Sequence, residues 1–329
     1  MRNNVVKIAA IGMLAVATGA YVHAQTVKSS IALPGAPEGI AVNYLTDRVY
    51  VAIPNFDNIS DTLAIVDGKT DAVISTISIP PVAQSVAVDL LRNLVYVAGT
   101  FFDVNGVEQS QVAVINGKSN KVIQVIPITT TPGSGLEGIS VNPFNGDVYV
   151  SNASDNVIDV IRHDCKKVTS QISVAESPFG ISLDPYNNRL YVALSDGTVD
   201  VIDAKKNVLL TTTTIGTSNA EIAVNWLTGH VFATNNVYGA STLGVLDKDG
   251  VVITNVPVGN TPFGVDVDFL TNLVFVSNTQ DGTVSVIDGK TNLPTLVLPV
   301  TGFYVAANPA TSKVYVGGQD ASLTVISEK

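Results

Sequence analysis

Carboxylates and aromatic rings recur at corresponding positions along the chain, each just ahead of a short run rich in Val and Ile. Aligned on Glu38, this position is polar in the first part of the chain and mostly phenylalanine in the second. The following position is small, except at Glu221 and Tyr304. If these positions meet around one axis, they form a concave site that is half polar and half aromatic, as small ligands prefer. The candidate ligand-binding residues are Glu38, Gln84, Glu137, Phe179, Glu221, Phe263, Asp266, Phe303 and Tyr304. The alternative is that the phenylalanines plug a channel as packing.

Asp266 is the one charged residue at a position that is otherwise Ala or Ser. Small residues at that position suit close packing between neighbouring repeats. A carboxylate there needs a hydrogen-bond partner or a raised pKa. Backbone amides or a bridging water would satisfy it, so we favour a structural role for Asp266 over a catalytic one.

Enzyme chemistry has weak support, and we predict no catalytic residue. Beyond the N-terminal segment the histidines are His163 and His230, which fall in different repeats, so no histidine cluster for a transition metal is expected. No Ser–His–Asp arrangement or phosphate-binding glycine loop is found. Glu38, Glu137 and Glu221 are candidate metal ligands, and calcium suits such oxygen donors. Apart from this possible calcium ion, we expect no cofactor. Cys165 is a lone cysteine, so no intrachain disulfide is expected.

The elements that position these residues come from a repeat. A buried-type aromatic residue recurs seven times at intervals of 40 to 53 residues, and an Asp-Gly-Lys-like turn follows each of the first six copies. Each repeat holds four short β-rich runs, which in the first repeat are Gly39–Asn43, Arg48–Ile53, Thr62–Asp67 and Ala72–Ile79. Four antiparallel strands in about 40–45 residues are typical of a propeller blade. The anchors are Tyr50, Tyr96, Tyr149, Tyr191, Phe232, Phe275 and Tyr315.

The two ends of the chain predict a closed ring. The last repeat supplies three strands, Phe303–Asn308, Lys313–Gly317 and Leu323–Ser327, and the missing fourth precedes the first repeat as Thr26–Leu33. Pairing of these segments removes an exposed sheet edge. We therefore predict an all-β, seven-bladed β-propeller over residues 25–329, closed by the N-terminal strand 26–33 in blade 7.

The repeats resemble the YVTN family of β-propeller repeats, which includes secreted and surface-layer proteins. The similar sequence covers residues 25–329, although the tetrapeptide Tyr-Val-Thr-Asn itself is absent and the second repeat carries insertions. The resemblance implies the propeller fold and leaves function open, because such propellers include surface proteins, binding scaffolds and a few enzymes. The matching segments include Tyr149–Asn152, Phe275–Asn278, Thr283–Asp288 and Ser177–Ile181.

Charge separates the two faces of the predicted ring. The loops that lead into the first strand of each blade, and those between its second and third strands, open on one face, which we call the mouth face. These loops hold twelve acids and no Lys, Arg or His, whereas every Arg beyond Arg2 falls on the opposite face. A cationic ligand or a basic protein is therefore the expected partner. A solvated acidic face without a ligand is the alternative. Insertions on the mouth face predict a partner ridge at Phe56, Phe101, Phe102 and Asp103.

Composition and the N-terminus suggest where the protein works. The net charge of −10 excludes a general nucleic-acid binder, which needs basic residues. Residues 1–24 combine Arg2 and Lys7 with an apolar run and Val22-His23-Ala24, as a signal peptide does. No stable membrane span is expected, because the apolar run of about 15 residues falls short of about 20. We expect a bacterial protein exported to the periplasm or cell surface, acting as a non-catalytic binding or scaffold module. The alternatives are a calcium-dependent hydrolase or lactonase and a propeller subunit of a larger periplasmic enzyme.

Overall fold

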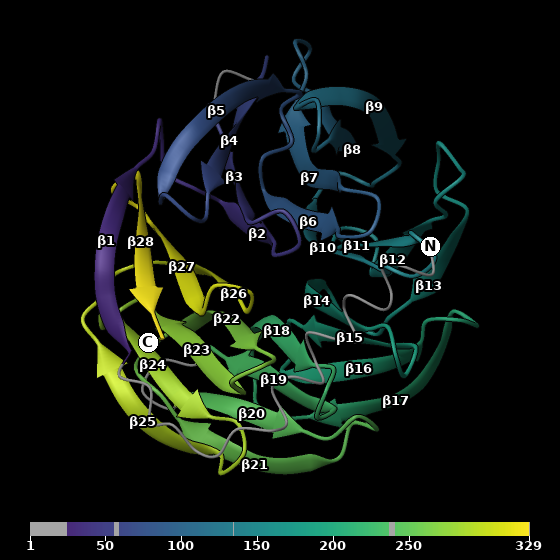
Figure 1. The fold of residues 1–329 in the computed structure, drawn as a ribbon. Coiled ribbons are helices and arrows are strands. Elements are labelled where there is room, and N and C mark those ends of the chain that lie inside the picture. The colour runs from purple at the N-terminus through teal and green to yellow at the C-terminus, as the bar shows by residue number, and fades with distance from the viewer. Residues whose placement is uncertain (1–24, 56–58, 134, 237–240, 329) are drawn as a thin grey trace.

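Seven antiparallel sheets of four strands each stand around a central axis (Figure 1). The computed structural model describes residues 25–55, 59–133, 135–236 and 241–328, and this part of the chain forms strands and turns without a helix. The predicted all-β, seven-bladed β-propeller is confirmed. Within the described residues, therefore, no helix is present that could cross a membrane.

The strands of each blade run from the axis outward in chain order, except in the last blade. The innermost strands of blades 1 to 7 are β2 (Gly39–Asn43), β6 (Ser85–Asp89), β10 (Leu136–Val141), β14 (Pro178–Asp184), β18 (Asn219–Asn225), β22 (Pro262–Asp268) and β26 (Tyr304–Asn308). The second strands are β3 (Arg48–Ile53), β7 (Leu94–Phe102), β11 (Val148–Asn152), β15 (Arg189–Leu194), β19 (His230–Asn235), β23 (Leu273–Asn278) and β27 (Lys313–Gly318). The third strands are β4 (Asp61–Asp67), β8 (Glu108–Asn116), β12 (Val157–Ile161), β16 (Thr198–Asp203), β20 (Thr242–Leu246), β24 (Thr283–Asp288) and β28 (Ser322–Ser327). The outer strands are β5 (Ala72–Ile79), β9 (Lys121–Ile128), β13 (Ser170–Ser173), β17 (Val208–Thr214), β21 (Val252–Pro257), β25 (Leu293–Leu298) and β1 (Thr26–Ala32).

The N-terminal strand closes the ring. Blade 7 has the order β1-β28-β27-β26, so its outer strand comes from the start of the chain and its inner three from the end. Strand β1 pairs antiparallel with β28 from Thr26 opposite Ser327 to Ala32 opposite Ser322. The predicted closure is therefore confirmed, with the strand ending one residue earlier than predicted. Leu33 still donates its backbone N–H to the Ala321 carbonyl.

The recurring aromatic residues are the cores of the blades. Six of the seven rings are completely buried, and Tyr96 is 4% exposed. Several hydroxyl groups at the ends of these rings reach the next blade: Tyr149 donates to the Ala204 carbonyl at 2.8 Å and Tyr191 to the Lys248 carbonyl at 2.9 Å. Tyr149 and Tyr191 thus fill their blades and also satisfy a carbonyl of the next blade.

Close contact between blades explains the small residues near the axis. A Cβ atom on Gly264 would lie 2.2 Å from the Phe303 carbonyl oxygen, and one on Gly138 would lie 2.5 Å from the Phe179 carbonyl oxygen. A side chain at either glycine would push adjacent innermost strands apart. The positions that are not glycine, such as Glu221 and Tyr304, therefore place their side chains where most blades have none.

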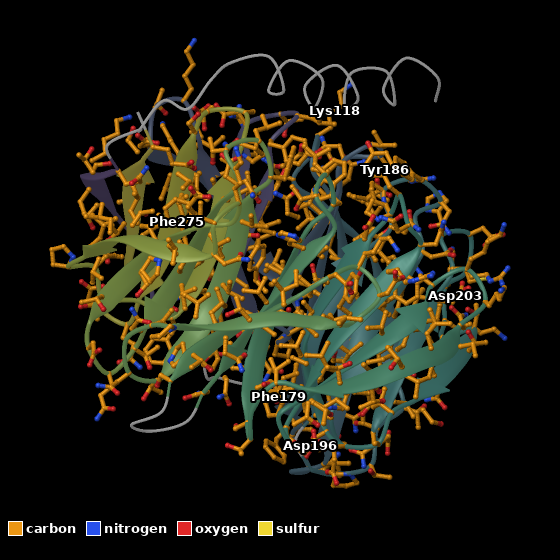
Figure 2. All side chains as sticks on the ribbon, turned by 90° about the horizontal axis from the view of Figure 1, so that it is seen from below. Lys118, Phe179, Tyr186, Asp196, Asp203 and Phe275 are labelled. Carbon is orange, nitrogen blue, oxygen red and sulfur yellow. The ribbon has the colours of Figure 1, made fainter. Side chains whose placement is uncertain are left out.

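The two ends of the axis carry different residues. Figure 2 shows Phe179 and Asp196 together at one end of the molecule, and Lys118 and Tyr186 toward the opposite end. This matches the predicted division into a mouth face, which holds Phe179 and Asp196, and an opposite face, which holds Lys118.

Candidate functional site

A cavity of about 320 Å³ lies at the mouth-face end of the axis. Its walls come from the innermost strands of all seven blades, which bring residues far apart in sequence to one place. Seven of the nine residues predicted to bind ligand line this cavity: Glu38, Gln84, Glu137, Phe179, Glu221, Phe263 and Tyr304.

Phe303 and Asp266 are placed differently from those seven. Phe303 is not among the residues that line the cavity, and its ring packs edge-on against Phe263, with a centroid distance of 5.7 Å. Tyr304 lines the cavity in blade 7 instead, and its ring meets that of Phe263 at 5.7 Å and 88°. The aromatic side of the cavity is therefore a packed wall of rings, of which Phe263 and Tyr304 face the ligand space. Asp266 lies deeper along the axis.

The glutamates of the cavity have strongly perturbed acidity. Burial, and then the charge of Glu38, raise the pKa of Glu137 from 4.5 to about 7. The pKa of Glu221 is likewise raised to about 7, first by burial and then by the charge of Glu137. Burial and the nearby Asp61 raise the pKa of Glu38. Each carboxylate thus disfavours charge on the others, so a bound cation would relieve both effects.

No basic side chain neutralises these glutamates within the described residues. The ion pairs of this part of the chain join other acids, for example Arg48 to Asp67 at 2.6 Å and Arg92 to Asp89 at 3.0 Å, both away from the mouth. The pKa of the Tyr304 hydroxyl is raised by burial and then by the charges of all three glutamates. The mouth therefore holds three carboxyl groups that form no ion pair with a basic side chain of the described residues.

Several other acids of the mouth face have structural roles. Asp61 is buried and accepts hydrogen bonds from the backbone N–H groups of Asn55 and Ala83. Asp155 accepts from the hydroxyl of Thr131 at 2.6 Å, and Asp281 from the backbone N–H of Asn260 at 2.7 Å. Such bonds hold loops and turns in place. Several of the twelve predicted acids therefore hold loops, three are the mouth glutamates, and Glu176 is exposed, while Asp57 lies outside the described residues.

His163 and His230 lie apart from the mouth glutamates, so the residues that could take part in metal-dependent or histidine-dependent catalysis do not meet in one site. Within the described residues, no group of three or more His, Cys, Asp or Glu is arranged to hold a metal ion. His163 is exposed, and His230 places its Nδ1 3.2 Å from the Gly289 carbonyl oxygen, so neither joins the axial glutamates. Cys165 is partly buried and its thiol lies 3.6 Å from Asp164.

The predicted partner ridge is a hairpin that projects from blade 2. Strands β7 and β8 pair as far as Phe102 opposite Glu108. Phe101 is partly buried and Phe102 is 53% exposed, while Asp103 accepts hydrogen bonds from the backbone of the tip at Asn105. The ridge thus presents one exposed ring, and its acid holds the turn. Phe56 lies outside the described residues.

Asp266 bridges two blades. Its Oδ1 accepts from the N–H of Val267, and its Oδ2 accepts from the N–H of Ala307 in blade 7, both at 2.8 Å. Burial raises its pKa to about 6, although the two backbone hydrogen bonds oppose that rise. The hypothesis that backbone amides satisfy this carboxylate agrees with the geometry.

Replacement of Asp266 by Ala should destabilise the protein by about 1–3 kcal/mol, because the Ala307 N–H would be left without its acceptor. The equivalent position in blade 4 is Ser182, so Ser182→Ala is a matched control that should be nearly neutral. Denaturant unfolding of both variants measures the difference. A neutral Asp266→Ala would show that the bridge contributes nothing to the fold.

An aromatic cluster at the other end of the axis was not predicted. Tyr44, Phe269, Trp226, Tyr186 and Phe144 form a chain of ring contacts with centroid distances of 4.6 to 5.5 Å. The signal was present in the sequence, because the Asn or Asp at the end of each innermost strand, or directly after it in blade 3, is followed by an apolar residue. These residues are Tyr44, Leu90, Pro143, Pro185, Trp226, Phe269 and Pro309.

Comparison with known proteins gives no relative: no family model matches the chain, and no curated protein is significantly similar to it.

Proposed function

We propose that this protein is a non-catalytic binding module that takes up a positively charged group at the mouth of its axis. The observation that carries the proposal is the convergence of Glu38, Glu137 and Glu221 in one cavity with an aromatic wall. Carboxylates attract a cation by charge, and the faces of Phe263 and Tyr304 attract it through their π electrons. Basic side chains of a protein and small organic cations both present such a group.

Ionised Glu137 and Glu221 lower the stability of the empty protein, and this cost supports a functional role for them. Burial raises the pKa of Glu137 and Glu221 to about 7, so their ionised forms destabilise the empty protein at neutral pH. Glutamine or a small residue would fit these positions at lower cost, as Gln84 does at the position of Glu137 and Ser85 at the position of Glu221. Groups that destabilise the fold are common at functional sites, where they are kept for what they bind.

We further propose that the protein is exported and belongs with the YVTN-type propellers. The N-terminal Arg2 and Lys7, the apolar run and Val22-His23-Ala24 support export, and the repeat text supports the family. A propeller fold is consistent with a binding or scaffold module. In that setting the partner is a basic protein surface or a cationic ligand of the periplasm or cell surface.

Charge reversal on the two faces tests the proposal. The variant with Glu38, Glu137 and Glu221 changed to Lys should bind spermidine and an oligolysine peptide at least about tenfold more weakly than the parent, and the difference should shrink at high salt. The control variant carries Lys69, Lys118 and Lys290 changed to Glu on the opposite face. It should bind both probes with nearly the parent affinity, as measured by calorimetric titration. Equal affinity of the two variants would refute the assignment of the mouth.

A further inference from the structure

The axial space does not end at the mouth. A second cavity of about 260 Å³ lies deeper along the axis and shares Ile40 with the first. The same three strands line both cavities with successive residues. On β22, Val265 lines the first cavity and Asp266 the second, and on β26 the change falls between Val305 and Ala306. The two cavities, which we call chambers, therefore follow one another along the axis, with Ile40 between them.

Branched apolar side chains form the boundary between the chambers. They occupy the same position on successive innermost strands, and they give the floor of the first chamber an apolar surface. They are Ile40, Val86, Ile139, Ile181, Val265 and Val305.

The deeper chamber repeats the chemistry of the mouth. Asp266 lines it, and each of its carboxylate oxygens accepts one backbone hydrogen bond and has a lone pair left for a second. Tyr44, Trp226 and Phe269 line it as well, with the Trp226 and Phe269 rings 4.6 Å apart. The Tyr44 hydroxyl is buried and has no hydrogen-bond partner among the described residues. A buried hydroxyl in that condition favours a ligand that supplies the missing partner.

The mouth glutamates and Asp266 form two levels of carboxylates along the axis, and a short alkyl chain would span the distance between them. In the aligned strands Asp266 is two positions deeper than Glu221, which corresponds to about 7 Å at roughly 3.3 Å per residue. Glu38 and Glu137 are one position higher than Glu221, so the span reaches about 10 Å. The apolar boundary fills the interval between the two levels.

We propose that the axis binds a linear aliphatic diammonium ion lengthwise, with one ammonium group among the mouth glutamates, the alkyl chain across the apolar boundary, and the second ammonium group at Asp266 and the Tyr44 hydroxyl. This inference rests on the proposed function, since it names the class of cation that the same mouth takes. A bare divalent metal matches the arrangement less well, because a single compact charge cannot occupy both levels.

Calorimetric titration of the full ring with three probes tests the inference. Hexane-1,6-diamine carries two charges on one apolar chain, hexylamine carries one, and calcium chloride supplies the compact divalent ion. We expect the diamine to bind at least tenfold more tightly than hexylamine. Asp266→Asn keeps the shape of the side chain and removes its charge. In this variant the affinity for the diamine should fall to that for hexylamine, while the affinity for hexylamine should change less than threefold. Glu221→Gln should weaken both amines.

A variant that leaves every carboxylate intact guards against a misfolded Asp266→Asn. Ala41 lines the deeper chamber, so Ala41→Leu should block it and remove the advantage of the diamine without affecting hexylamine. Equal binding of the two amines to the parent protein would overturn the two-level inference and leave the proposed function standing. Binding of neither amine would overturn both. Calcium that binds more tightly than the diamine and displaces it would identify the mouth as a metal site and also overturn the inference.

Discussion

A chain that begins at Pro34 should aggregate or melt far below one that begins at Gln25. The missing segment contains β1, which pairs with β28 along its length and contributes Ile31 and Leu33 to the buried core. Without it, blade 7 has three strands, and β28 presents an open edge to solvent. Thermal unfolding and light scattering of the two forms measure the effect. A shortened chain with the melting temperature of the longer one would refute closure of the ring by this strand.

Point substitutions in β1 give a graded version of that experiment. Ile31 is 6% exposed, so Ile31→Ala should destabilise by about 2–5 kcal/mol, as the loss of a large buried side chain usually does. Val27 is 46% exposed on the same strand, and Val27→Ala should cost far less. Equal destabilisation by the two substitutions would show that β1 does not pack its apolar face against the core of the blade.

The combined variant Glu137→Gln and Glu221→Gln should be more stable than the parent at pH 8, by roughly 1–3 kcal/mol. Both folded-state pKa values lie near 7, above the ordinary value of 4.5, so protonation stabilises the folded state. That stabilisation is complete below about pH 4.5 and is lost as the pH rises through about 7. The parent should therefore become more stable as the pH falls from 8 toward 5, and the variant should lose most of this dependence.

Glu176→Gln supplies the matched control, because Glu176 is an exposed glutamate on the same face. It should change neither the stability at pH 8 nor its pH dependence. Denaturant unfolding at several pH values makes the comparison. If Glu176→Gln and the mouth variant behave alike, the mouth glutamates are solvated and have no special role.

Repetition made the fold predictable from the sequence. The aromatic anchors occur seven times and the Asp-Gly-Lys-like turns six times, so an error in one repeat is corrected by the others. The first-blade strands Gly39–Asn43 and Arg48–Ile53 were predicted with their observed ends. The polar and aromatic column near the axis followed from the same alignment. Seven of its predicted residues line one cavity.

The alignment could not predict side-chain direction or depth. Phe303 aligns with Glu38, yet its ring packs behind Phe263 and Tyr304 takes its place in the cavity. The aromatic cluster around Trp226 depends on how turns from different blades meet, which no single repeat encodes. Loop acids such as Asp61 also looked like part of a charged surface, because the backbone groups that they hold are visible only in three dimensions.

An electron-density map of crystals grown with hexane-1,6-diamine would show directly whether a diammonium ion binds along the axis. We expect density along the axis, with one end among Glu38, Glu137 and Glu221 and the other near Asp266. Density for a compact ion at the mouth, or a diamine bound elsewhere while the axis stays open at saturating concentration, would contradict this expectation.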